Sequence, residues 1–203
     1  MKGNIKKLAV FVMIAGIAMF MAVPTASAND LWWKMLIHGE YAFTGSGACT
    51  LAPGGFDENF KPYNAIYASM GPNFWEGVYT FNYNGKGKMD ARQSYQLGPD
   101  NTPNTYSAGS DLLSWEFEYK MDGPEITFTF IPETYSLEYL EGPNKGLKLL
   151  PPNNAVFDKP WTGRISPDGR NLFVFYGGPA KLEIPEFGIE LICNAVHQGF
   201  KTH

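Results

Sequence analysis

The feature that most constrains the fold of this chain is a period of two in its hydrophobic residues. In residues 114–121 every second position carries a large apolar side chain, and polar side chains fill the positions between them. Residues 75–82, 125–131 and 188–196 repeat this alternation. Successive side chains of a β-strand point to opposite faces, so the period predicts strands that bury one face. Residues 171–176 are apolar on both faces, which predicts a strand that is covered on both sides.

Turn signals separate the predicted strands and set the fold class. The pairs Asn84-Gly85 and Asp168-Gly169 combine residues that tolerate the positive φ angles of a hairpin. Strand and turn recur roughly every 8–14 residues, which is typical of an all-β protein. We therefore expect an antiparallel meander of about eight to ten strands that closes into a barrel.

The first 28 residues have the three-part layout of a secretory signal peptide. Lysines precede an uncharged apolar run over residues 8–23, and Ala26-Ser27-Ala28 supplies the small residues before a cleavage site. The alternative is a retained membrane anchor, but a run of about 16 residues is short against the ~20 that span a bilayer. We expect residues 1–28 to be removed and residues 29–203 to form one exported domain, periplasmic or secreted, without a membrane span. A short helix over residues 30–38, with Asp30 as its N-cap, would precede the barrel.

Composition and charge exclude several classes of partner. The chain has 16 basic and 20 acidic residues, and removal of three signal-peptide lysines leaves 13 basic residues and a net charge of −7. An acidic domain without a stripe of Lys and Arg repels a phosphate backbone, so we expect no nucleic-acid binding. Three histidines and two cysteines provide few metal ligands, and we expect neither a metal nor another cofactor.

The two cysteines, Cys49 and Cys193, predict one disulfide if the protein is exported to an oxidising compartment. Two buried free thiols are the alternative. A catalytic thiol is not favoured, because His197 follows Cys193 by four residues and lies roughly 13 Å away along a strand. Residues 49–72 predict a long ordered loop, and residues 98–109 predict a mobile surface loop.

The aromatic residues of the alternating segments predict a common interior. A barrel of about eight strands has a centre that side chains just fill or that holds one small ligand. Both interpretations stay open at this point: the rings form either a plain core or the wall of a cavity for an apolar or aromatic guest. Arg164 alternates with Ile165, so it could orient an anionic guest from the wall. The candidate wall residues are Trp75, Tyr79, Phe81, Trp115, Phe117, Tyr119, Phe128 and Arg164.

Catalytic motifs are missing from the sequence, and no catalytic residue is assigned. The segment Gly45-Ser46-Gly47 predicts a turn, and His38 lies at the predicted helix end. His197, close to the C-terminus, is predicted to be solvated. Glu116 and Glu118 have the spacing of paired carboxylates, but they lie on the polar side of their strand, which predicts a solvated outer face.

Four segments carry a resemblance to known proteins: residues 39–45, 48–56, 75–82 and 163–169. They resemble segments of small uncharacterised exported bacterial proteins. The resemblance implies a lipocalin-like (calycin) or allene-oxide-cyclase-like barrel and carries no activity with it. The segment Gly39-Glu40-Tyr41 has a tyrosine where the lipocalin Gly-x-Trp signature has tryptophan.

The function hypothesis is an exported barrel that binds a small hydrophobic or aromatic molecule in its interior. One alternative is a barrel enzyme of the isomerase or cyclase type, which needs a buried polar group such as Glu40 or Arg164. Another is a non-catalytic interaction module of the cell envelope. An outer-membrane barrel is disfavoured, because the predicted outward faces carry Glu and Lys. A void on the order of several hundred Å³ would support ligand binding, and a filled interior would support a scaffold.

Overall fold

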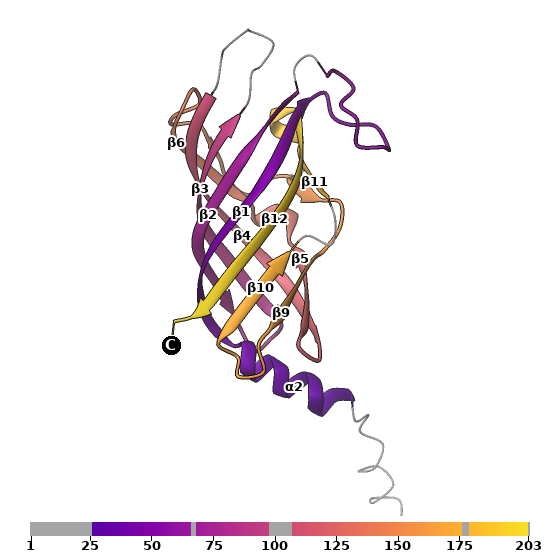
Figure 1. The fold of residues 1–203 in the computed structure, drawn as a ribbon, viewed down its shortest axis with the longest axis vertical. Helices are drawn as coiled ribbons and strands as arrows, with labels where there is room; N and C mark the ends of the chain where they lie inside the picture. Colours follow the sequence, from indigo (N-terminus) through magenta and orange to yellow (C-terminus); the bar gives the residue numbers. More distant parts are fainter. Residues whose placement is uncertain (1–25, 66–67, 98–106, 176–178, 203) are drawn as a thin grey trace, which may run out of the picture.

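The computed structural model of the chain describes residues 26–65, 68–97, 107–175 and 179–202. Within these residues one helix precedes a single antiparallel sheet, drawn in Figure 1. The longer elements are α2 (Ala26–Ile37), β1 (Gly39–Pro53), β2 (Ser69–Phe81), β3 (Lys86–Leu97), β4 (Ser107–Asp122) and β12 (Ile189–Lys201). The shorter strands are β5 (Glu125–Phe130), β6 (Ser136–Glu141), β7 (Lys148–Leu149), β8 (Val156–Phe157), β9 (Trp161–Ile165), β10 (Asn171–Phe175) and β11 (Ala180–Ile184). Two 3₁₀ turns, η1 (Pro132–Thr134) and η2 (Pro185–Phe187), complete the chain.

Eight of the strands close into a barrel, as the alternation predicts. The ring runs β1-β2-β3-β4-β5-β9-β10-β12, and β12 pairs with β1 from Tyr41 opposite Lys201 to Pro53 opposite Ile189. Directly paired residues lead from strand to strand around the ring, starting at Asp111 of β4. The last pair returns to β4 at Met121, ten residues further along. This offset tilts the strands against the barrel axis, which closure requires.

The two ends of the barrel differ in construction. Near α2, β4 pairs with β5 and β12 pairs with β10, whereas at the opposite end the same two strands pair with β6 and β11. β7 then pairs with β6, and β8 with β11. No pairing joins β7 to β8 among the described strands, and the connecting segment contributes buried Asn153, whose Nδ2 donates to Tyr135 O. The wall at this end is therefore partly built from shorter strands.

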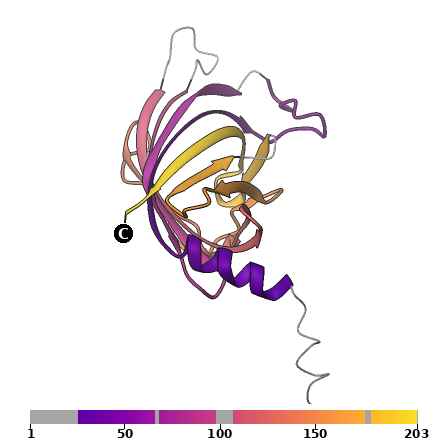
Figure 2. The same ribbon diagram turned by 60° about the horizontal axis from the view of Figure 1, so that its bottom comes forward.

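Helix α2 lies across one end of the barrel (Figure 2). Its last residue, Ile37, is fully buried, and Lys201 Nζ donates to Leu36 O at 2.8 Å. The prediction of a helix over residues 30–38 placed its start too late: the helix begins at Ala26, and Asp30 pairs with Lys34 within it instead of capping it. An i,i+4 pair of this kind stabilises a helix from its interior.

Aromatic side chains fill the barrel interior next to α2. The rings of Phe81 and Phe117 are 5.4 Å apart, and those of Phe117 and Phe128 are 5.2 Å apart. Both pairs have the edge-to-face geometry that favours aromatic packing. The predicted inward side of each alternating segment is thus confirmed. The fully buried aromatic side chains of this half are Tyr41, Tyr79, Phe81, Phe117 and Phe128.

Three predictions about chain segments were wrong. Gly45-Ser46-Gly47 is not a turn but the middle of β1. The long loop expected over residues 49–72 is shorter, because β1 continues to Pro53 and β2 begins at Ser69. The strand over residues 171–176 is not covered on both sides, since Phe173 and Phe175 are exposed. Long strand pairing with β12 and β2 overrides the local preference of the glycines in β1.

Cys49 and Cys193 form the predicted disulfide, which links β1 to β12 across 144 residues. Residues 1–25 of the predicted signal peptide and residues 98–106 of the predicted surface loop lie outside the described residues.

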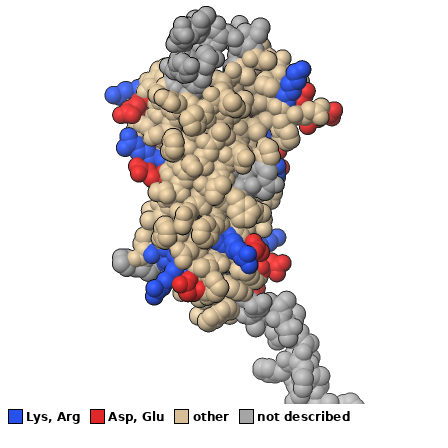
Figure 3. Space-filling model, in the orientation of Figure 1, with Lys and Arg blue, Asp and Glu red and all other residues tan. Residues whose placement is uncertain are grey.

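Charged side chains avoid the mid-height of the face formed by β1, β12 and β10 (Figure 3). The polar side of β4 is exposed as predicted, including Glu116 and Glu118.

Candidate functional site: a cavity in the barrel

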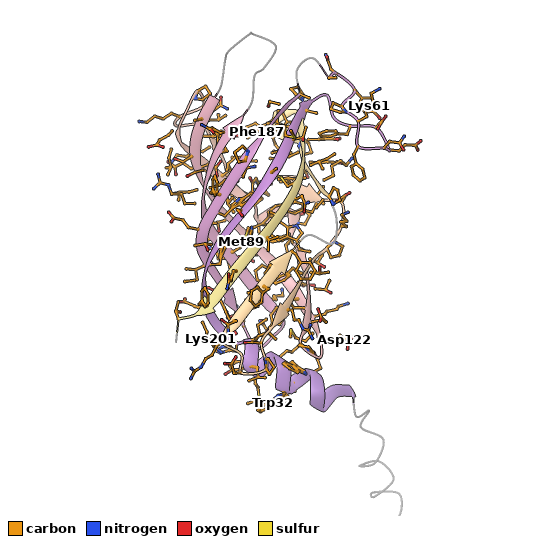
Figure 4. The ribbon with its side chains drawn as sticks, in the orientation of Figure 1. Trp32, Lys61, Met89, Asp122, Phe187 and Lys201 are labelled. Carbon is orange, nitrogen blue, oxygen red and sulfur yellow. A yellow bond between two sulfur atoms is a disulfide. The ribbon has the colours of Figure 1, made fainter. Side chains whose placement is uncertain are left out.

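The barrel interior away from α2 encloses a cavity of about 130 Å³. Met89, at mid-height in Figure 4, lies at its base, and Ile184, Ile189 and Leu191 line it toward the far end. The exposed Asn144, in the turn between β6 and β7, also lines the cavity, which therefore reaches the surface beside this turn. The volume is below the several hundred Å³ expected for a ligand pocket and resembles that of a cavity that holds one benzene-sized ring.

Asp111 places a buried carboxyl group in the cavity wall. It is 4% exposed, and its Oδ1 atom has no hydrogen-bond partner among the described residues. Burial raises the pKa of the Asp111 carboxyl to about 7. The register between β4 and β6 shifts between Ser110 and Asp111, so a bulge lies at this position. Bulges of this kind redirect side chains and are frequent next to functional sites.

His197 places an uncharged imidazole in the same wall. It is 2% exposed, and its Nδ1 atom shares a 2.7 Å hydrogen bond with Tyr79 Oη. Its Nε2 atom has no hydrogen-bond partner in the part of the chain that the structure describes. The ring stacks on Phe43 at a centroid distance of 4.9 Å. Burial lowers the pKa of His197 to about 3, so the ring is neutral near pH 7. The prediction that His197 is solvated was wrong, because β12 extends to Lys201 and His197 is one of its inward-facing residues.

Gly45 of β1 makes room for the His197 ring. A Cβ atom at Gly45 would lie 2.3 Å from Cδ2 of His197, a separation that no real side chain tolerates. His197, Gly45, Trp75, Gln93 and Asp111 occupy successive strands in one register row. The closed sheet thus fixes both polar groups on the inside of one continuous wall.

The predicted wall residues divide into three groups. Trp75 and Trp115 line the cavity. The other five rings, Tyr79, Phe81, Phe117, Tyr119 and Phe128, belong to the filled half and do not line it. Arg164 was placed wrongly: it lies on the outer face with its side chain 63% exposed, and its Nε atom is 3.3 Å from Glu125 Oε1. Inward residues of β9 are its neighbours Gly163 and Ile165, so Arg164 has the opposite parity.

Sequence reasoning missed Asp111, and it misplaced His197. Both fit the period of two: Asp111 shares the parity of Trp115 in β4, and His197 shares that of Cys193 in β12. Extending each alternation by one or two steps would have placed both in the interior. Glu40, suggested as a buried polar group for an enzyme, is exposed.

The cavity wall can receive an apolar ring and offer it hydrogen bonds. Aromatic and aliphatic side chains form most of the wall. Within the wall, Gln93 Nε2 donates to Asn73 Oδ1 at 3.2 Å. No group of three or more His, Cys, Asp or Glu that could hold a metal ion occurs in the described part of the chain. A second, shallower depression on the outer face of β3, β4 and β6 contains none of the buried polar side chains.

The chain matches no protein-family model and no curated protein. Among the described residues, no helix combines the length and hydrophobicity needed to cross a membrane. The fold and cavity by themselves define the class: a closed eight-stranded antiparallel barrel, bridged by a disulfide, with a small cavity in one half.

Proposed function

We propose that this protein is an exported barrel that binds one small apolar or aromatic molecule in its cavity. The observation that carries the proposal is a pair of buried polar atoms, Asp111 Oδ1 and His197 Nε2, in an otherwise mostly apolar wall. Neither atom has a hydrogen-bond partner within the described ranges of the chain. A buried polar group without a partner costs about 1–3 kcal/mol of stability. A guest that hydrogen-bonds to these atoms would offset that cost. An interior that serves only as a hydrophobic core does not need polar atoms at these positions. Export is supported by the Cys49–Cys193 disulfide.

Tryptophan fluorescence tests the proposal, because Trp75 and Trp115 line the cavity. We expect single-ring molecules, whether neutral, cationic or anionic, to include at least one that shifts the emission in a saturable way. The phenylalanine variant of Leu113, an inward residue that lines the cavity, fills space and weakens this binding at least tenfold.

The matched control is the same substitution at Leu112, the next residue of β4, which is 46% exposed on the outer side. Leu112→Phe leaves the binding unchanged. The proposal fails if no single-ring probe of any charge binds, or if Leu113→Phe and Leu112→Phe bind equally well.

A barrel enzyme is the second candidate, and Asp111 is the observation that favours it. A carboxyl group whose pKa is raised to about 7 can both accept and donate a proton near neutral pH. Recovery of the bound molecule distinguishes the two functions. A binding protein returns each probe chemically unchanged after long incubation, whereas an enzyme returns a product identifiable by mass or NMR spectrum.

A further inference from the structure

Within the proposed function, on which this inference rests, we infer that the guest is a cationic amine that carries one apolar ring. Its ammonium group would bind at Asp111, and its ring would lie among the aromatic side chains of the wall. The charge balance of the wall carries the inference: among the described lining residues Asp111 is the one acidic side chain, and neither Lys nor Arg is present.

An ammonium group supplies what the Asp111 carboxylate lacks. The unpartnered Oδ1 atom can accept a charge-assisted hydrogen bond, which is about twice as strong as a neutral one. Aromatic faces add to this, because a cation over an aromatic ring is attracted by the negative face of its π system. Tyr95 and Tyr139 line the cavity beside Asp111, and Tyr139 lies directly opposite it in the β4–β6 register.

An anionic guest finds no cationic partner among the described residues that line the cavity. A carboxylate would lie near Asp111 without a Lys or Arg to compensate either charge, and paired like charges in a buried site are strongly unfavourable. His197 does not change this, because its ring is neutral near pH 7. The wall therefore discriminates by the sign of the guest's charge.

The size of the cavity limits the rest of the guest. A volume of about 130 Å³ is close to that of an engineered apolar cavity that accepts benzene. One ring with a short aminomethyl arm fits this space, and a fused-ring amine exceeds it. Benzylamine, benzyl alcohol and benzoate are therefore suitable probes, since they present one ring with a cationic, a neutral and an anionic substituent.

Among the described residues that line the cavity, Asp111 is the titratable group whose charge changes near neutral pH. Tyr95 comes from β3, while Tyr135 and Tyr139 come from the chain that leads into and forms β6. Burial raises the pKa of all three tyrosines, so they stay neutral, as does His197 on β12. Benzylamine remains protonated in this range, so its affinity follows the ionisation of Asp111.

Calorimetric titration of the full mature chain with the three probes tests the inference. We expect benzylamine to bind at least tenfold more tightly than benzyl alcohol and benzoate at pH 8. Asp111→Asn lowers the affinity for benzylamine about 10- to 100-fold, the equivalent of a charged hydrogen bond, and changes that for benzyl alcohol less than threefold. The control Asp90→Asn removes a carboxylate from the outer face of β3 and leaves all three affinities unchanged.

A pH series on the unaltered protein gives the same answer if Asp111→Asn does not fold. The affinity for benzylamine falls at least tenfold from pH 8 to pH 5, as Asp111 takes up a proton, while that for benzyl alcohol stays constant. Equal binding of benzylamine and benzyl alcohol, or tighter binding of benzoate, overturns the cationic guest and leaves the proposed function standing. Absence of binding by all three probes overturns both.

Discussion

At the scale of single residues, burial shifts the pKa values of Asp111 and His197 in opposite directions. Burial raises the pKa of Asp111 from 3.8 to about 7, so this side chain favours the fold below pH 3.8 and loses that contribution as the pH rises through 7. Burial lowers the pKa of His197 from 6.5 to about 3, so its contribution is complete above pH 6.5 and is lost as the pH falls toward 3. Between these limits the two effects oppose each other.

Replacement of Asp111 separates the two effects. Between pH 3.8 and about pH 7, the pKa values of Asp111 in the unfolded and folded chain, each pH unit changes the comparison by about 1.4 kcal/mol. The unfolding free energy of Asp111→Asn rises by this amount relative to that of the unaltered protein. The difference in stability between the two proteins is thus about 2–3 kcal/mol more favourable to the variant at pH 8 than at pH 5. Urea denaturation at both pH values measures it.

The outer-face variant Asp90→Asn provides the comparison for this experiment, since a surface substitution changes stability by less than about 1 kcal/mol. Identical stability differences for Asp111→Asn at pH 5 and pH 8 would show that the carboxyl group is solvated in the folded protein.

At the scale of elements, α2 closes the barrel mainly through its C-terminal turn. Ile37 is fully buried in the aromatic core, whereas Met35, Leu31 and Trp32 are exposed on the other side of the helix (Figure 4 labels Trp32). Tyr41 Oη also donates to Gly169 O at 2.6 Å, which ties the start of β1 to the β9–β10 turn. The helix therefore contributes to stability through a small number of buried atoms.

Truncation of Ile37 tests this role. Ile37→Ala removes a fully buried side chain and lowers the unfolding free energy by about 2–5 kcal/mol, because a cavity remains in its place. Met35→Ala, two residues earlier and 53% exposed, changes it by less than about 1 kcal/mol. Equal effects of the two substitutions in thermal or urea denaturation would mean that α2 does not pack on the barrel.

The alternation predicted β2, β4, β5 and β12, whereas the long strands β1 and β3 were not predicted. Trp115, Phe117 and Tyr119 face the interior as their period of two requires, and β4 extends beyond the predicted segment at both ends. The shorter strands β6, β7, β8 and β11 were not predicted separately, because their positions depend on distant partners in β4 and β12. The predicted relationship to lipocalin-like barrels stays a prediction.

The cavity was predictable only in part. Alternation identifies which side chains face inward, but it does not tell where inward side chains leave space. Rings such as Phe81 and Phe128 pack against each other near α2, whereas Trp75 and Trp115 border a void in the other half. Arg164 was misassigned because a one-residue error in parity turns a side chain to the other face.

At the scale of the whole molecule, the β1–β12 seam closes the barrel. The disulfide crosses this seam at directly paired residues, Cys49 and Cys193. A bond that spans 144 residues restricts the unfolded chain and stabilises the fold by about 5 kcal/mol in the chain-entropy account.

Reduction of the disulfide therefore lowers the unfolding free energy by up to about 5 kcal/mol, without opening the seam under native conditions. Urea denaturation with and without a reductant measures the loss, and circular dichroism monitors the strands. The double variant Cys49→Ser, Cys193→Ser is the control, whose stability does not respond to the reductant. Loss of strand structure on reduction alone would contradict a barrel held mainly by pairing and core.

The central claim is that the half of the barrel away from α2 receives a single-ring guest. A crystal structure of the protein soaked with bromobenzene tests it most directly, because anomalous scattering locates the bromine atom. We predict one bromine site inside the barrel, within van der Waals distance of Trp75 and Trp115 and on the same wall as Asp111. An interior without a bromine site, with the Trp115 and Leu137 side chains closed over the space, would contradict the claim.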